Sequence, residues 1–157
     1  MASLLQGIGN WPGAVWLQDS GTAYLFVNAT HILGIGLLIG AILPLDLRLL
    51  GLFRKTSITA VGPFLSRVGA TGLAIAVPCG LWLFTVKPDE YIQNTAFLCK
   101  AALLTAALIN IAFQHGNRHY RVALEGGAIH PRVRAHALIS LLLWPSILIA
   151  GRWIGFL

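Results

Sequence analysis

Histidines are the residues of this sequence with the greatest capacity for chemistry, because few of its other side chains could bind a metal or a haem iron. His31 lies in the middle of a long apolar run, whereas His115, His119 and His136 lie near the ends of two later runs. Neutral imidazole binds haem iron, copper and zinc. His115 and His119 are four residues apart and would share one face of a helix, as metal ligands can. These four histidines are therefore the candidate metal ligands.

Two cations beside the histidines could bind an anionic group, such as a haem propionate. Lys100 lies near the start of the third apolar run, and Arg152 lies near the end of the fourth. Each could instead be an anchor among lipid headgroups, because long basic side chains extend along their apolar stems to the membrane surface. The candidate cofactor-binding residues are therefore His31, His115, His136, Lys100 and Arg152.

His31 shares its side of a predicted helix with other polar residues. At about 100° per residue, Tyr24, Asn28 and Asp46 all fall within roughly 60° of it. An ionisable residue inside a membrane is costly and usually marks a functional site. We expect this face to point into the protein interior.

Four apolar runs must position these residues, and each is long enough to cross a membrane. The chain of 157 residues is 57% hydrophobic and only 10% charged, whereas soluble domains carry about 25% charged residues. A spanning helix needs about 20 apolar residues, and the runs do not alternate as strands do. The sequence therefore predicts an all-α integral membrane four-helix bundle, in a single transmembrane domain. The predicted spans cover about residues 21–45, 67–86, 95–114 and 135–156.

Segments outside the spans predict smaller features. Trp11 and Trp16 indicate a short N-terminal segment lying at the membrane interface, where amphipathic indoles prefer to sit. Residues 57–66 predict a short interfacial helix before the second span. Cys79 and Cys99 lie near the same membrane face, so a disulfide is conceivable, but the apolar context favours buried free thiols.

The basic residues predict the orientation of the bundle. They gather in the first and third loops, whereas the second loop has only Lys87 and the N-terminal segment has none. The first and third loops contain Arg48, Arg54, Lys55, Arg118, Arg121, Arg132 and Arg134. The positive-inside rule therefore places both loops in the cytoplasm and both termini outside it. The basic residues that set the topology explain the net charge of +6, so we predict no nucleic-acid partner.

Small residues at helical spacing predict contacts between helices or between subunits. Gly36 and Gly40 form a GxxxG pattern on the first span, and Gly72, Ala76 and Gly80 continue such a pattern on the second. Small residues let helix backbones approach closely inside a membrane. These faces predict a homo-oligomer or a subunit of a membrane complex.

Three segments resemble a family of small bacterial inner-membrane four-helix proteins with no established activity. They are THILGIGLLIGAILPLDLRLLG (30–51), FLCKAALLTAALIN (97–110) and ISLLLWPSILIAGRWIGF (139–156). The resemblance implies a bacterial inner membrane with periplasmic termini. It gives weight to His31, Asp46, Arg48, Lys100, Trp144, Arg152 and Trp153. The chain departs from the family at Asn28, where a glutamate is expected.

A more distant resemblance concerns the first histidine helix. HILGIGLLIG is similar to the corresponding helix of cytochrome b561-like bundles and of copper-resistance membrane proteins. These resemblances imply haem or copper. Met1 is the only methionine, and this lack of soft ligands argues against a Cu(I) route.

Three functions remain open from the sequence. The first is a protein that binds haem b and transfers electrons between quinone and a membrane or periplasmic partner. It needs two histidines at similar depth, and His31 with His115 or His115 with His136 are the available pairs. The second is a structural or anchor subunit without a cofactor. The third is a copper-handling or ion-handling protein. The sequence lacks HExxH, GxSxG and Walker motifs and does not identify an enzyme.

Overall fold

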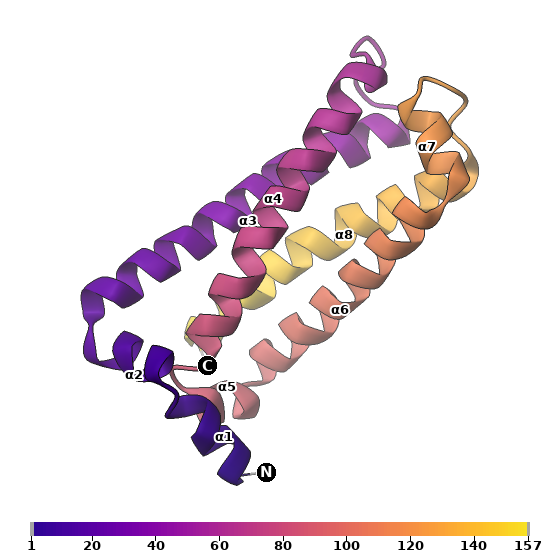
Figure 1. Ribbon diagram of the computed structural model, residues 1–157. Helices are drawn as coiled ribbons and strands as arrows, with labels where there is room; N and C mark the ends of the chain where they lie inside the picture. Colours follow the sequence, from indigo (N-terminus) through magenta and orange to yellow (C-terminus); the bar gives the residue numbers. More distant parts are fainter. Residues whose placement is uncertain (1, 157) are drawn as a thin grey trace.

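The computed structural model describes residues 2–156, and over these residues all regular secondary structure is helical (Figure 1). The helices are α1 (Ala2–Gly9), α2 (Pro12–Asp19), α3 (Gly21–Leu50), α4 (Ile58–Phe84), α5 (Pro88–Gln93), α6 (Thr95–Gly116), α7 (Arg118–Leu124), α8 (Pro131–Trp153) and the 3-10 helix η1 (Ile154–Phe156). Four of them, α3, α4, α6 and α8, are long and apolar enough to cross a membrane. The predicted all-α, four-span, multi-pass bundle is confirmed.

The second span begins earlier than the sequence predicted. A separate interfacial helix over residues 57–66 is wrong, because α4 begins at Ile58 and continues without a break. Pro63 removes one backbone donor, yet packing holds this segment in the helix. Ile58 is buried in the core, and Gly62 packs against Leu124 of α7. Contact with a neighbouring helix therefore overrides the low hydropathy of this stretch.

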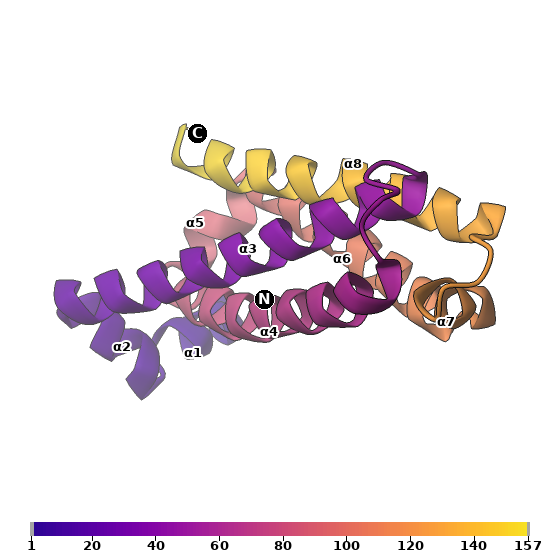
Figure 2. The same ribbon diagram turned by 90° about the horizontal axis from the view of Figure 1, so that it is seen from above.

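The four long helices form a bundle that is closed on three sides. α3 packs against α4 and α8, and α6 packs against α8. α4 and α6 make almost no contact with each other over the described residues. Figures 1 and 2 show α3 beside α4, and α6 beside α8, running between the same two ends. The side between α4 and α6 is therefore the least tightly packed.

The two ends of the bundle differ in composition. The helices α1, α2, α5 and η1 gather at one end, which we call the terminal end (Figure 1). The other end, which we call the arginine-rich end, holds residues 51–57, α7 and residues 125–130. It carries the arginines that the sequence predicts to be cytoplasmic.

Glycines allow α3 and α4 to pack backbone against backbone. A Cβ atom added to Gly72 would lie 2.5 Å from the Leu38 nitrogen, and one added to Gly34 would lie 2.7 Å from the Ala76 nitrogen. Real Cβ atoms do not approach backbone atoms so closely, so only glycine fits at these two positions. This contact aligns the polar residues of α3 with α4.

The small-residue faces serve different partners from those predicted. Gly72, Ala76 and Gly80 were expected to meet another subunit, but they face α3 of the same chain. Here the prediction is wrong, because the α3–α4 contact uses this groove. A Cβ added to Gly36 or Gly40 would meet nothing within 4 Å. Those two glycines stay available to lipid or to another chain.

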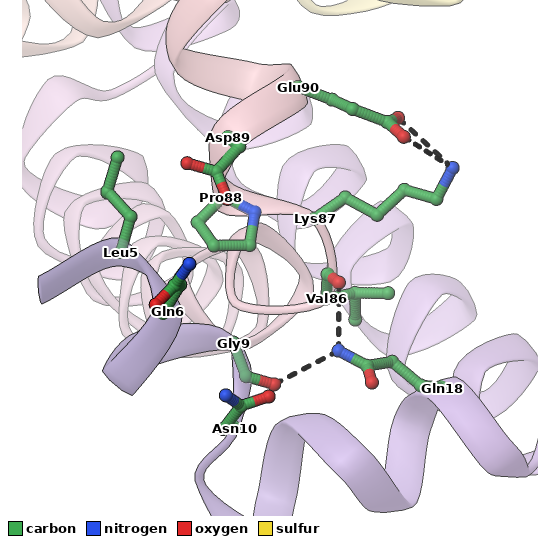
Figure 3. Close-up of a pocket in the computed structure, with 10 residues that line it drawn as sticks. All are labelled: Leu5, Gln6, Gly9, Asn10, Gln18, Val86, Lys87, Pro88, Asp89 and Glu90. Carbon is green, nitrogen blue, oxygen red and sulfur yellow. Dashed lines mark hydrogen bonds and ion pairs between the residues drawn. The ribbon is translucent and has the colours of Figure 1, made fainter. Parts of the chain in front are cut away.

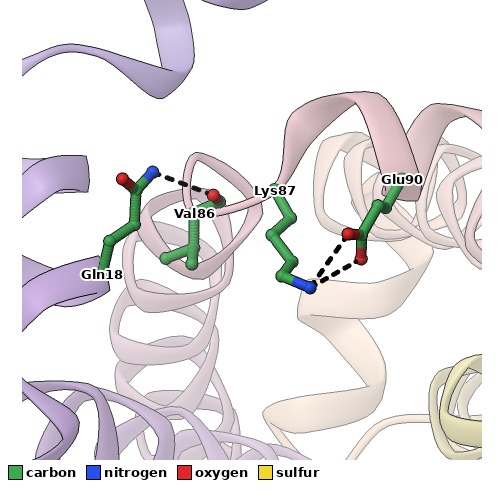
Figure 4. A network of polar contacts seen from close by, with 4 residues as sticks. All are labelled: Gln18, Val86, Lys87 and Glu90. Carbon is green, nitrogen blue, oxygen red and sulfur yellow. Dashed lines mark hydrogen bonds and ion pairs between the residues drawn. The ribbon is translucent and has the colours of Figure 1, made fainter.

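The N-terminal segment forms two short helices that pack on the terminal end. The Trp82 ring of α4 stacks on Trp16 with ring centres 5.8 Å apart, and its Nε1 donates to the Gly13 carbonyl at 3.0 Å. Gln18 Nε2 donates to the carbonyls of Gly9 and Val86 at 3.1 and 3.0 Å (Figures 3 and 4). These bonds tie α1 and α2 to the end of α4.

A hollow of about 290 Å³ lies beside these contacts at the terminal end (Figure 3). Lys87 and Glu90 form an ion pair at its edge, with a nitrogen–oxygen distance of 2.9 Å (Figure 4). Both side chains are mostly exposed, and exposed ion pairs contribute little to stability. No polar side chain that lines this hollow is buried, so we do not assign it as a binding site.

His130 begins α8 and makes this helix start sensitive to pH. Its Nδ1 accepts a hydrogen bond from the Arg132 backbone N–H at 3.2 Å, and its ring stacks on His119 with centres 4.0 Å apart. Desolvation lowers the pKa of His130 below its ordinary 6.5, and the charges of His119 and Arg132 lower it further. The folded protein therefore favours the neutral ring, which can accept that bond.

We expect the stability contributed by His130 to be complete above about pH 6.5 and to fall as the pH drops through the lowered pKa, because the unfolded chain then binds more protons. The His130→Asn variant caps the helix without titrating. Thermal melting in detergent from pH 5 to pH 8 should show a smaller decrease at acidic pH for this variant. An unchanged pH dependence would exclude His130 as its source.

Candidate functional site

A polar cavity of about 250 Å³ lies inside the bundle, in the half nearest the arginine-rich end. Leu38 and Ile42 on one side belong to a mid-bundle apolar cluster, and Leu45 and Tyr120 on the other belong to a second cluster near α7. The polar lining residues come from all four long helices and α7: Asp46, Ser66, Asn110, Gln114, His115, Tyr120 and Ser140. The cavity therefore lies between two apolar clusters and has a mainly apolar lining with a few polar groups.

Asp46 is the charged residue of this cavity and is almost completely buried. Only 4% of the residue is exposed, although it lies one turn before the end of α3. Ser140 of α8 lines the same cavity as this carboxyl, and the Oδ2 atom of Asp46 has no hydrogen-bond partner. Over the described residues, no lysine or arginine forms an ion pair with it. A buried carboxyl with an unmatched oxygen is costly to keep.

Gln114 provides a second unmatched polar atom on the opposite side. The residue is 7% exposed, and its Oε1 atom has no hydrogen-bond partner. By contrast, both polar atoms of the Asn110 side chain, one turn earlier on α6, form hydrogen bonds. Its Nδ2 donates to the His136 carbonyl at 3.1 Å, and its Oδ1 accepts from the His136 Nδ1–H at 2.7 Å. The unmatched oxygens of Asp46 and Gln114 are thus specific features of the cavity.

Tyr120 and His115 form the wall nearest the arginine-rich end. The Tyr120 hydroxyl lies 3.3 Å from the Ser66 hydroxyl, and the ring lies 5.0 Å from the His115 ring. Burial raises the pKa of the Tyr120 phenol, so its hydroxyl stays protonated and can donate a hydrogen bond. His115 Nδ1 donates to the Ile111 carbonyl of its own helix at 3.1 Å.

These groups can bind a small polar ligand or ordered water. Water occupies about 30 Å³ per molecule and needs two to four polar partners, so a cavity of this size and polarity holds several. The Gln114 Oε1 atom can only accept a hydrogen bond, whereas Asp46 can accept one when ionised or donate one when protonated. The cavity therefore suits a ligand that donates at least one hydrogen bond.

His31 lies outside this cavity, in the half nearest the terminal end. Its Nδ1–H donates to the Ala76 carbonyl of α4 at 2.8 Å, and the ring fits against Gly80. A carbonyl only accepts hydrogen bonds, so the proton is on Nδ1 and Nε2 carries a free lone pair. The Lys100 stem lies along Gly151 of α8.

A comparison with protein families finds one that covers nearly the whole chain. The family model is described as a family of unknown function, DUF6644, and it matches residues 5–157. The chain belongs to the DUF6644 family. No curated protein and no solved structure matches it. The function of this DUF6644 protein is therefore inferred from its own geometry.

The DUF6644 bundle does not bring its histidines together. His31 lies ten residues after the start of α3 and His115 twenty residues after the start of α6, and both helices start at the terminal end. The ten-residue difference places His115 about 15 Å deeper. His136 is bonded to Asn110, and His119 is stacked on His130. Within residues 2–156, no three His, Cys, Asp or Glu side chains form a group that could hold a metal ion.

A haem is therefore only partly matched by the DUF6644 chain. His31 fits one axial position, because its orientation is held through Nδ1 and its Nε2 is free. A second histidine at the same depth is not found among the described residues. Lys100 lies in the same half, whereas the Arg152 side chain is exposed and lies over the Phe156 ring at 5.5 Å. Cys79 and Cys99 are free thiols.

The sequence analysis selected histidines as candidate site residues. The structure adds cavity-lining residues whose types are common in proteins. Asp46 was placed on the inward face of its helix and was given weight by the family resemblance, but it was not selected as a cofactor-binding or metal-binding residue. Its position among other polar residues on that face could have identified it as a site residue, because a buried carboxyl inside a membrane span is rare. Ser66, Tyr120 and Ser140 gave no such signal, because their types are common and their helices are far apart in sequence.

Proposed function

We propose that this DUF6644 protein binds a small hydrogen-bonding ligand in the membrane-embedded cavity and exchanges a proton with it through Asp46. The observation that carries the proposal is the buried Asp46 carboxyl, which lines the cavity and whose Oδ2 has no hydrogen-bond partner. A carboxyl that only supported the fold would be matched by hydrogen bonds or by a cation, because an unmatched one destabilises the bundle.

The residues around Asp46 support proton exchange. The hydroxyls of Ser140, Ser66 and Tyr120 line the same cavity and can each donate and accept a hydrogen bond. The cavity lies near the arginine-rich end, and we propose that this end faces the cytoplasm of a bacterium, as the positive-inside rule predicts for an inner-membrane protein. In that orientation both termini are periplasmic, and Asp46 lies closer to the cytoplasmic water than to the periplasm.

A lipid-soluble carbodiimide tests the proposal, because it reacts with protonated carboxyls inside membranes. The chain has five acidic residues, and the other four, Asp19, Asp89, Glu90 and Glu125, are exposed. We expect dicyclohexylcarbodiimide to modify Asp46 in protein reconstituted in lipid, as read by peptide mass spectrometry. Modification at Asp46 should increase as the pH falls, because the reagent consumes the protonated form.

The Asp46→Asn variant should lose the adduct and keep the fold, since asparagine has the same shape. A water-soluble carbodiimide is the matched reagent and should modify Glu125 or Asp89 instead. If the lipid-soluble reagent leaves Asp46 unmodified at every pH while the protein stays folded, the carboxyl exchanges no proton and the proposal is wrong.

A second candidate function is electron transfer through haem b, and His31 favours it. The Nδ1–H bond to the Ala76 carbonyl is the arrangement that orients a histidine ligand and leaves Nε2 for a metal. A bound haem would supply one-electron chemistry. His31 would hold the iron, and Lys100 would pair with a propionate in the same half of the bundle. A cofactor-free anchor subunit remains the third candidate, with the open Gly36 and Gly40 face as its contact surface.

A further inference from the structure

The cavity lies beside the least tightly packed side of the bundle. α3 packs against α4 and α8, and α8 packs against α6, so three sides are sealed by helix contacts. The fourth side, between α4 and α6, has almost no contact over the described residues. Ala70 of α4 lines the cavity and is itself exposed, so it marks the mouth on this side. This side is therefore where we place the entrance for a molecule dissolved in the bilayer.

The lining of the cavity has an apolar part and a polar part. Leu38, Ile42, Leu73 and Ile111 contribute aliphatic surface. Asp46 and Gln114, near the arginine-rich end, contribute the two unmatched oxygens. This distribution fits a molecule with a flat apolar body and polar groups at its edge. A phospholipid headgroup fits less well, because over the described residues no lysine or arginine lines the cavity to bind its phosphate.

We infer that the ligand of this cavity is the head of a lipid-soluble quinol, which enters between α4 and α6. The inference rests on the proposed function of Asp46 and gives its ligand a chemical class. A quinol carries two hydroxyl donors on opposite edges of an apolar ring, and the cavity offers two unmatched oxygens on two different helices. One hydroxyl donates to Gln114 Oε1, and the other pairs with Asp46. The isoprenoid tail leaves through the open side into lipid.

Protection of Asp46 from the lipid-soluble carbodiimide gives a direct readout of this binding. The probe is a benzoquinol with a decyl tail, kept reduced, with the protein in nanodiscs of zwitterionic phospholipid. Its dimethyl ether is the matched control, because it keeps the ring and tail but has no donor. We expect the quinol to slow the labelling of Asp46 and the ether not to do so. Ligand-induced thermal stabilisation provides a second measurement that does not depend on labelling.

Three variants locate the site. Gln114→Leu removes one acceptor and should weaken quinol binding about tenfold or more, the equivalent of one hydrogen bond to a buried group. Ala70→Trp should block the mouth and abolish protection, whereas Thr71→Trp, on the neighbouring exposed position outside the cavity, should not.

The outcomes separate the inference from the proposed function. Equal protection by quinol and ether overturns the quinol assignment, because donors are then irrelevant. No protection and no thermal shift, with Asp46 still labelled, also overturns it but leaves a water-filled proton-exchanging cavity. If Asp46 is never labelled, the proposed function fails, and the thermal shift alone decides whether a quinol binds.

Discussion

The Gly72→Ala variant is expected to lose about 3 kcal/mol of stability or most of its folded yield, although alanine adds only one methyl group. The added Cβ would lie 2.5 Å from the Leu38 nitrogen and 2.7 Å from the Gly34 carbonyl oxygen, so α3 and α4 must move apart. Overpacking of this kind usually costs about 1–3 kcal/mol, and here the obstacle is backbone that cannot rotate away. Thermal or denaturant unfolding in detergent measures the effect.

The matched control is Gly36→Ala, on α3 with nothing within 4 Å of the added atom. Alanine favours a helix over glycine by about 1 kcal/mol, so this variant should be neutral or slightly more stable. If both variants unfold alike, the close α3–α4 approach does not exist in the membrane. If Gly36→Ala is the damaging one, the open glycine face packs against another chain.

The second large effect belongs to the haem candidate. Protein purified from haem-replete cells should show a Soret band, and His31→Ala should abolish it, because His31 is the histidine held with a free Nε2 in the terminal half. Lys100→Ala should weaken haem retention more mildly, since it removes one partner of a propionate and not a ligand of the iron. The visible spectrum and the iron content of the purified protein measure both changes.

His115→Ala is the matched histidine control, since His115 is exposed and about 15 Å deeper along the bundle. It should keep the band. Loss of colour in His115→Ala but not in His31→Ala would mean that the iron lies elsewhere. A folded, colourless protein without iron or copper would exclude the haem and metal candidates together and leave the Asp46 cavity as the functional centre.

Helix content and span number follow from local sequence. Every backbone group inside lipid must find an internal partner, so an apolar run of sufficient length has to be helical. The helix ends were predicted only in part, because α3 continues to Leu50 and the predicted span ended at residue 45. α3 starts at the Ser20 cap and ends at Gly51, whose φ of 105° only glycine adopts readily. The predicted third span from residue 95 coincides with the start of α6 at Thr95, which is capped by Asn94.

The short helices and the start of α4 could not be predicted from the local sequence. The stretch 57–66 contains Pro63 and polar residues, so hydropathy separated it from the span. It joins α4 because Ile58 enters the core near α7 and Gly62 fits against Leu124. Those contacts link residues that are more than sixty positions apart, and no local pattern contains them.

The candidate site shows the same division. Histidine type and intramembrane position drew attention to His31, and the structure does orient this ring for a ligand. The unmatched oxygens of Asp46 and Gln114 came from the tertiary structure alone. Periodicity places each residue on a face of its own helix, but the depth and rotation of one helix against another decide which faces meet.

Sequence by itself determined the number of helices long and apolar enough to cross a membrane and an arginine-rich side, because these depend on the solvation of each segment separately. Only the tertiary structure decided between small-residue patterns that look alike in sequence. Gly72 meets the backbone of α3, whereas Gly36 and Gly40 meet nothing in the chain. The physical reason is that burial of a glycine depends on a partner surface of matching shape. That surface exists only after α3, α4 and α8 have packed together. This packing leaves few contacts between α4 and α6 over the described residues.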